Sequence, residues 1–260
     1  MKLYKIAALL HSDLIVLKNS KWKVIEYFYS SLVLVIIWGL FSTYMRNFSI
    51  EAGLIVLIIS IFWNFAYVAQ AAINQEMNDD VWSGSFKQII STGISEFEYL
   101  FARMLFSSII TTVVTAVMLL PSLYIFNINI IADNFSLIFL FAGATFIASL
   151  GMATMLAAAY ITLGREYGFL AWSALQLFVL LSAPFYPISI FPDFMQPLIA
   201  IMPYTNIFEG LRMLVTTGYV AGQYIVNSWT IALGYFFVSL PLYWLAFKKA
   251  RKTGALVKLT

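Results

Sequence analysis

Six long apolar stretches without a charged residue follow one another along the chain, separated by short polar segments. They cover Tyr27–Met45, Ala52–Gln75, Met104–Ala132, Asn134–Gly164, Tyr167–Pro192 and Met213–Phe247. A helix needs about 20 apolar residues to cross about 30 Å of hydrocarbon. Each stretch suits one crossing, the first by borrowing a residue or two at its ends. The pattern therefore predicts an all-α membrane protein with six transmembrane helices. A membrane β-barrel would show alternating segments of about 10 residues, which these continuous runs are not.

The composition agrees with this class. The chain is 62% hydrophobic and 10% charged, whereas soluble domains carry about 25% charged residues. A soluble enzyme and a disordered chain are therefore excluded. There is no cysteine, which excludes disulfides and thiol chemistry. No cleavable signal peptide is expected at the amino terminus.

The basic residues predict the orientation. Most flank the termini and the even-numbered connections: Lys2, Lys5, Lys18, Lys21, Lys23, Lys87, Arg103, Arg165, Lys248, Lys249, Arg251, Lys252 and Lys258. Only Arg46 and Arg212 fall on the other side. The positive-inside rule then places both termini in the cytoplasm of a multi-pass plasma-membrane protein. The basic tail directly follows a span, so contact with anionic lipid head groups is expected rather than nucleic-acid binding.

Residues 1–23 predict a helix that lies in the cytoplasmic interface. Its apolar residues recur at three- and four-residue spacing: Leu3, Ile6, Leu10, Leu14 and Leu17. Lys2, Lys5 and Asp13 lie off that stripe. The alternative is a simple extension of the first span.

The connection 75–103 is the longest one predicted on the cytoplasmic side. Turns near Gly84 and Gly93 bracket a predicted short helix at about 83–91. Phe86, Ile89 and Ile90 would form a small apolar face on it, and an apolar tip on a water-exposed loop indicates a partner.

The region 184–225 combines apolar character with helix breakers. Five prolines stand in it: Pro184, Pro187, Pro192, Pro197 and Pro203. It predicts re-entrant half-helices that dip into the membrane from outside and cap a pathway, because such backbone must be buried in protein or line a cavity. Tyr186, Pro203 and Tyr204 belong to this cap. The alternative is a flexible hydrophobic loop.

A few polar residues lie where lipid would disfavour them. Asn64 and Gln70 fall in the second span and Gln176 in the fifth, so each should face the bundle or a pathway. Hydrogen bonds between helices are the alternative. Glu209 and Arg212 stand at i, i+3 and predict an ion pair at the external interface.

No catalytic or metal-ligating constellation appears in the sequence. The G-x-x-x-x-G-K-[ST] pattern of a nucleotide-binding loop is also missing, so this chain should bind no ATP through such a loop.

Two motifs resemble a known family. Glu76 followed by GSFKQIISTGIS at 84–95 resembles the second-loop pattern of ABC-2 type transporter permeases, with Ser85 and Gly93 in place of the family's threonine and proline. MPYT at 202–205 with EGLR at 209–212 resembles the family's motif before the last span. With the predicted topology, the resemblance covers residues 1–260 as one transmembrane domain.

The resemblance implies one half of a dimeric export pore, paired with a second identical or related permease and driven by two separate ABC ATPase subunits. These would hold the ATP and Mg²⁺. It further implies a coupling helix that contacts the ATPase through Asp79, Asp80, Trp82, Gly84, Phe86, Lys87, Ile89 and Ile90. The expected substrate is a drug, lipid or other amphiphile. The alternatives are a lipid-linked polysaccharide or, from another class, an ATP-independent channel or secondary carrier.

Overall fold

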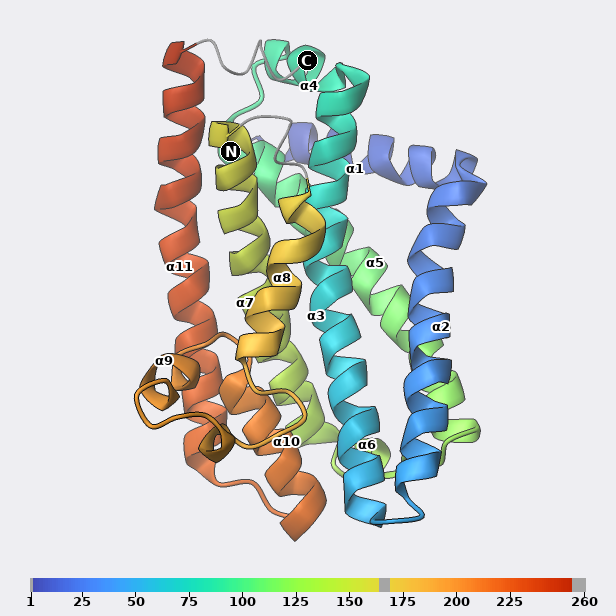
Figure 1. The fold of residues 1–260 in the computed structure, drawn as a ribbon. Helices are drawn as coiled ribbons and strands as arrows, with labels where there is room; N and C mark the ends of the chain where they lie inside the picture. The colour runs from blue at the N-terminus through green and yellow to red at the C-terminus, as the bar shows by residue number, and fades with distance from the viewer. Residues whose placement is uncertain (1, 164–168, 254–260) are drawn as a thin grey trace.

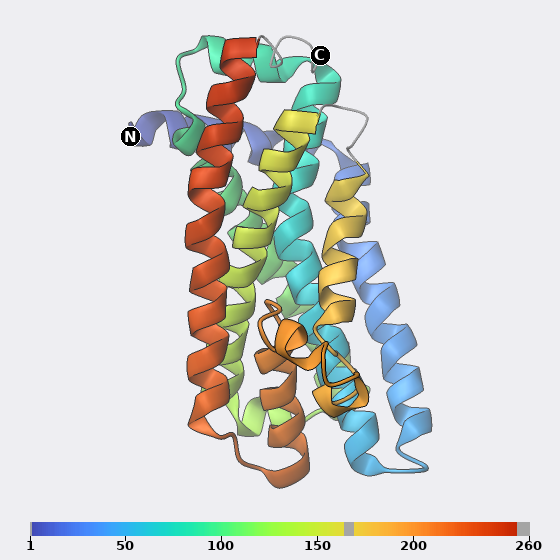
Figure 2. The same ribbon diagram turned by 60° about the vertical axis from the view of Figure 1, so that its left-hand side comes forward.

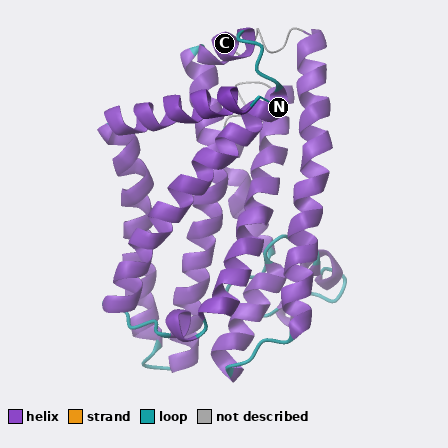
Figure 3. Ribbon diagram, turned by 180° about the vertical axis from the view of Figure 1, so that it is seen from behind, coloured by secondary structure: helices purple, strands orange, loops and turns teal. Residues whose placement is uncertain are grey.

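The computed structural model describes residues 2–163 and 169–253, and in these ranges it contains helices and no strand (Figures 1 and 3). The helices are α1 (Leu3–Asn19), α2 (Lys21–Met45), α3 (Ile50–Ser83), α4 (Ser85–Ser91), α5 (Glu96–Tyr124), α6 (Ile130–Asp133), α7 (Phe135–Leu163), α8 (Leu170–Leu181), the 3₁₀ helix η2 (Ile188–Ile190), α9 (Gln196–Ala200), α10 (Thr205–Thr217) and α11 (Gly222–Thr253). The predicted all-α class is confirmed.

Five helices of the described ranges are long and apolar enough to cross a membrane. They are α2, α3, α5, α7 and α11. They run side by side as a bundle, and α4 lies at one end of it, called here the α4 end (Figure 1). The chain is therefore a multi-pass membrane protein.

The fifth predicted span, Tyr167–Pro192, is not one long helix. Its beginning lies outside the described residues, and α8 has 12 residues, or about 18 Å at 1.5 Å per residue. It ends where Ala183 takes a left-handed φ of 52° and Pro184 follows, which cannot continue the helical hydrogen bonding. In Figure 2, α8 occupies the half of the bundle nearer the α4 end, and α10 the opposite half.

Helix α1 lies across the other helices at the α4 end, as an interfacial helix would (Figure 1). It buries Ile6 and Leu9 against the bundle. Asp13, expected on the polar side, is buried as well. The expectation for Asp13 was wrong because its carboxylate forms a buried ion pair with Arg103 of α5, described below.

The connection between α3 and α5 is more helical than predicted. Helix α3 continues to Ser83, and Gly84 then turns the chain with a φ of 74°, a conformation that suits glycine. The short helix predicted at 83–91 is present as α4. Ser95 and Glu98 form a capping box that starts α5.

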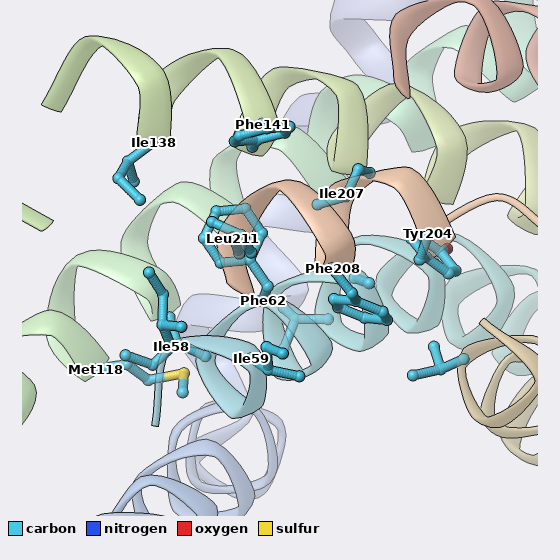
Figure 4. Close-up of a cluster of buried hydrophobic side chains, with 14 of the residues drawn as sticks. Ile58, Ile59, Phe62, Met118, Ile138, Phe141, Tyr204, Ile207, Phe208 and Leu211 are labelled. Carbon is cyan, nitrogen blue, oxygen red and sulfur yellow. The ribbon is translucent and has the colours of Figure 1, made fainter. Parts of the chain in front are cut away.

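Two packing arrangements hold the bundle together. Helix α10 places Ile207, Phe208 and Leu211 against a buried cluster from α3, α5 and α7 (Figure 4). Helices α7 and α11 approach closely at Gly151, where an added Cβ would lie 2.8 Å from the backbone nitrogen of Phe236. The short helix α10 therefore belongs to the hydrophobic core, and α7 and α11 are in close backbone contact.

Candidate functional site

A cavity of about 340 Å³ lies between α2, α3 and α8. Its lining combines aromatic and uncharged polar side chains: Ser30, Leu34 and Trp38 from α2, Ser60, Trp63, Asn64 and Tyr67 from α3, and Gln176 from α8. The α3 residues follow at spacings of three and four, so one face of the helix supplies them all. The cavity therefore offers hydrogen-bonding groups and aromatic surface without a charged residue in its lining.

Asn64 is the most unusual group in this lining. Its side chain is 3% exposed, and neither Oδ1 nor Nδ2 has a hydrogen-bond partner among the described residues. A buried polar group left unsatisfied costs about 1–3 kcal/mol. Asn64 is thus a donor and acceptor available to a molecule in the cavity.

Gln176 is held in place from the neighbouring helix. The indole Nε1 of Trp63 donates to Oε1 of Gln176 at 2.8 Å. Because an indole nitrogen can only donate, this bond fixes which end of the amide is oxygen and leaves Nε2 as the donating end. Both readings of Gln176 therefore hold: it joins two helices and it lines the cavity.

An aromatic cluster adjoins the cavity. The ring of Phe185, just after α8, stacks on Trp38 at 5.0 Å between centroids and lies 5.8 Å from the ring of Trp63. None of these three residues was among the predicted site residues. Trp63 lies next to Asn64, and its place on the same face of α3 is the one signal that the sequence offered.

The predicted ion pair of Glu209 and Arg212 positions the turn that carries Phe185. The carboxylate Oε1 of Glu209 lies 2.7 Å from NH2 of Arg212, which confirms the pair. NH1 of Arg212 donates to the carbonyls of Ala183 at 2.8 Å and Pro184 at 2.7 Å. Arg212 is 8% exposed, so protein surrounds most of the side chain.

The remaining residues predicted for the pathway or cap lie outside this lining. Gln70 is buried elsewhere on α3, and Tyr186 packs beside Phe191 with ring centroids 5.4 Å apart. Pro203 and Tyr204 are buried at the start of α10, where the hydroxyl of Tyr204 lies 3.1 Å from Oγ of Ser149.

A second polar site, the charge cluster, gathers four helices at the α4 end. The guanidinium of Arg103, 1% exposed, pairs with Asp13 of α1 at 2.5 Å and with Asp80 of α3. Lys23 of α2 pairs with Glu76 at 2.9 Å and with Asp79 at 2.7 Å.

The charge cluster stands in a costly environment. Burial raises the pKa of the Asp13 carboxyl above its ordinary value, although the positive charge of Arg103 opposes that rise. Ion pairs of buried and partly buried side chains therefore join α1, α2, α3 and α5, and each charge needs its partner.

Helix α4 is fastened to this cluster. Oγ of Ser85 donates to Oδ1 of Asp80 at 2.9 Å. Phe86 is 1% exposed and packs against Tyr99 and Phe247, so the prediction that it forms an exposed apolar tip was wrong. The apolar face of α4 instead packs against α5 and α11. Ile89 and Ile90 pack against the hydrophobic cluster that contains Phe86, Tyr99 and Phe247.

The exposed side of α4 is polar instead. Trp82 at the end of α3 is exposed, as are Lys87, Gln88 and Ser91 on α4. Asp79 is half exposed, and Asp80 faces inward to Arg103. Among the predicted contact residues, Asp79, Trp82 and Lys87 are therefore the exposed ones.

The described part of the chain contains no group of three or more His, Cys, Asp or Glu side chains placed to hold a metal ion.

Comparison with known proteins supports a transport role. No curated protein matches the sequence. The family model of the ABC-2 type transporter matches residues 6–216, a segment that contains the cavity, the charge cluster, α4 and the Arg212 turn. Such permeases are membrane components of transporters and are not themselves catalytic. This chain belongs to the ABC-2 type transporter family.

Proposed function

We propose that the chain is the transmembrane half of an ATP-driven exporter that moves an amphiphile out of the cytoplasm. The observation that carries this proposal is the cavity between α2, α3 and α8, where polar and aromatic groups meet within an apolar bundle. A cavity of this kind suits a molecule with both a polar and an apolar part. Two such chains would form the pore, with two separate ATPase subunits bound on the cytoplasmic side.

The α4 end is proposed to be cytoplasmic and to receive the ATPase. ATP and Mg²⁺ would be bound by that partner. Helix α4 joins α3 through Ser85 and Asp80, and α5 and α11 through Phe86. A displacement of α4 would therefore move these helices with it, since packed elements shift as units.

Helices α8 and α10 are proposed to make the sixth crossing in two pieces. Each is shorter than the roughly 30 Å of a hydrocarbon core, with 12 and 13 residues at about 1.5 Å each. The segment between them would then form the external re-entrant cap. Its buried backbone carbonyls at Ala183 and Pro184 are satisfied by Arg212, as backbone at membrane depth requires.

Co-purification with the cognate ABC ATPase tests the proposal. The double variant Lys87→Glu with Gln88→Glu reverses the charge on the exposed side of α4 while leaving buried residues unchanged. ATPase association and substrate-stimulated hydrolysis should fall about tenfold or more, since reversing the charge of a docking surface removes its match to the charges of the partner.

The matched control is Lys21→Glu, an exposed position at the start of α2 away from α4. It should leave association unchanged. Wild-type assembly of the α4 variant would contradict the docking assignment. Transport that continues in membranes without any ATPase would instead support a channel or secondary carrier.

A further inference from the structure

We infer that the α2–α3–α8 cavity selects an uncharged, hydrogen-bonding group carried on an apolar molecule, and that Asn64 recognises this group. The inference names a substrate class for the site of the proposed function, and it rests on that function only in calling the bound molecule a transported substrate.

The first argument is electrostatic. The lining holds seven uncharged polar or aromatic side chains and one leucine, so it offers no counter-ion. A charged group inside a membrane bundle is costly unless it is paired. The structure pairs its buried charges elsewhere, in the charge cluster and at Arg212. A ligand bound in the cavity should therefore be neutral at its polar end.

The second argument concerns hydrogen bonds. Asn64 presents an acceptor, Oδ1, and a donor, Nδ2, and both are buried without a partner among the described residues. Gln176 adds the donor Nε2, and its oxygen Oε1 already accepts a hydrogen bond from Trp63. A group that satisfies both amides must both accept and donate. A hydroxyl does so, whereas an ammonium can only donate and a carboxylate can only accept.

The third argument is size. A cavity of about 340 Å³ has roughly the space of eleven waters at about 30 Å³ each. That suits a small head group. Leu34 belongs to the lining and is 37% exposed, so an attached apolar chain would leave the cavity beside it. The rings of Trp38 and Trp63 provide apolar contact beside the polar groups.

Tryptophan fluorescence offers a direct test, since Trp38 and Trp63 line the cavity. The full chain is placed in phosphatidylcholine nanodiscs without ATP. Three probes share one brominated stearoyl chain, which quenches nearby tryptophans: a monoacylglycerol, a fatty acid and a fatty amine. The monoacylglycerol should quench saturably, at a mole fraction about tenfold lower than either charged probe, and its unbrominated form should reverse the effect.

Two variants locate the effect. Asn64→Leu removes the unsatisfied amide at similar volume and should raise the half-quenching mole fraction of the monoacylglycerol about tenfold, the equivalent of one lost hydrogen bond. Thr111→Val is the matched control, because Thr111 of α5 is another buried side chain with an unpartnered oxygen but lies outside the cavity lining. It should leave quenching unchanged.

Two outcomes would overturn the inference. One is equal quenching of the wild type by all three probes, or stronger quenching by a charged probe, which needs no variant to interpret. The other is an unchanged half-quenching point in folded Asn64→Leu. That result would show that Asn64 of the wild type does not bind the monoacylglycerol. Because no ATPase is present, these results are independent of the co-purification experiment, and either proposal can fail alone.

Discussion

At the residue scale, the guanidinium of Arg103 is surrounded by carboxylates from other helices. Asp13 and Asp80 pair with it, and Glu76 lies 3.9 Å away. Removing one partner of a buried ion pair is far more costly than never having had the pair, because the remaining charges stay desolvated. The charges around Arg103 are thus mutually dependent.

Arg103→Gln should lower the free energy of unfolding by about 3–5 kcal/mol, since it leaves buried carboxylates without their cation. Thermal unfolding in nanodiscs measures this. Arg251→Gln is the control, because its contact with Glu96 is 3.8 Å long and Arg251 is about half exposed. That change should cost less than about 1 kcal/mol. Equal losses in the two variants would show that the cluster contributes no more than a surface pair.

These same charges explain a limit of the sequence prediction. Glu76, Asp79 and Asp80 indicated a loop after Gln75, yet they belong to α3. Lys23 and Arg103, far away in sequence, neutralise them. Five of the spans, α4 and the Glu209–Arg212 pair depend on local pattern and were predictable. The burial of Phe86 and the bond between Trp63 and Gln176 depend on which helices become neighbours, which local pattern does not contain.

At the element scale, the contact between α7 and α11 depends on the small size of residue 151. A Cβ on Gly151 would lie 2.8–2.9 Å from backbone atoms of Phe236 and Tyr235, and backbone cannot move aside as a flexible side chain can. Gly151→Ala should therefore separate the helices and cost about 1–3 kcal/mol.

The matched control for this contact is Gly234→Ala on α11, where an added Cβ meets nothing within 4 Å. It should be neutral or slightly stabilising. Unfolding of the two variants in the same nanodiscs makes the comparison. A neutral Gly151→Ala would mean that the two helices tolerate a wider separation.

Arg212 supports the turn after α8 with a geometry that lysine lacks. One guanidinium reaches two carbonyls and Glu209 at once. Arg212→Lys should lower the free energy of unfolding by about 1.5–3 kcal/mol. It should also loosen the contact of Phe185 with Trp38 and Trp63, which a change in tryptophan fluorescence would report. Arg46→Lys is the control, since the guanidinium of Arg46 donates to the carbonyl of Phe126 at 2.8 Å. Similar changes in both variants would argue against a special role for the Arg212 fork.

At the scale of the whole molecule, the proposed orientation can be tested with single cysteines, because the chain has none of its own. Ser49→Cys, Asn129→Cys and Asp193→Cys should react with an impermeant reagent added to intact cells. Ser91→Cys and Lys252→Cys should be protected until the membrane is opened. All five positions are exposed, so burial does not explain protection. Labelling at position 91 in intact cells would reverse the orientation.

The pairing of Asp13 with Arg103 also has a consequence for synthesis of the chain. Asp13 leaves the ribosome about 90 residues before Arg103, which at roughly 5–20 residues per second is on the order of ten seconds. During that interval Asp13 has no Arg103 to bury it, and its carboxylate must stay hydrated. Helix α1 therefore reaches its final place only after α5 is made, although it is the first helix synthesised.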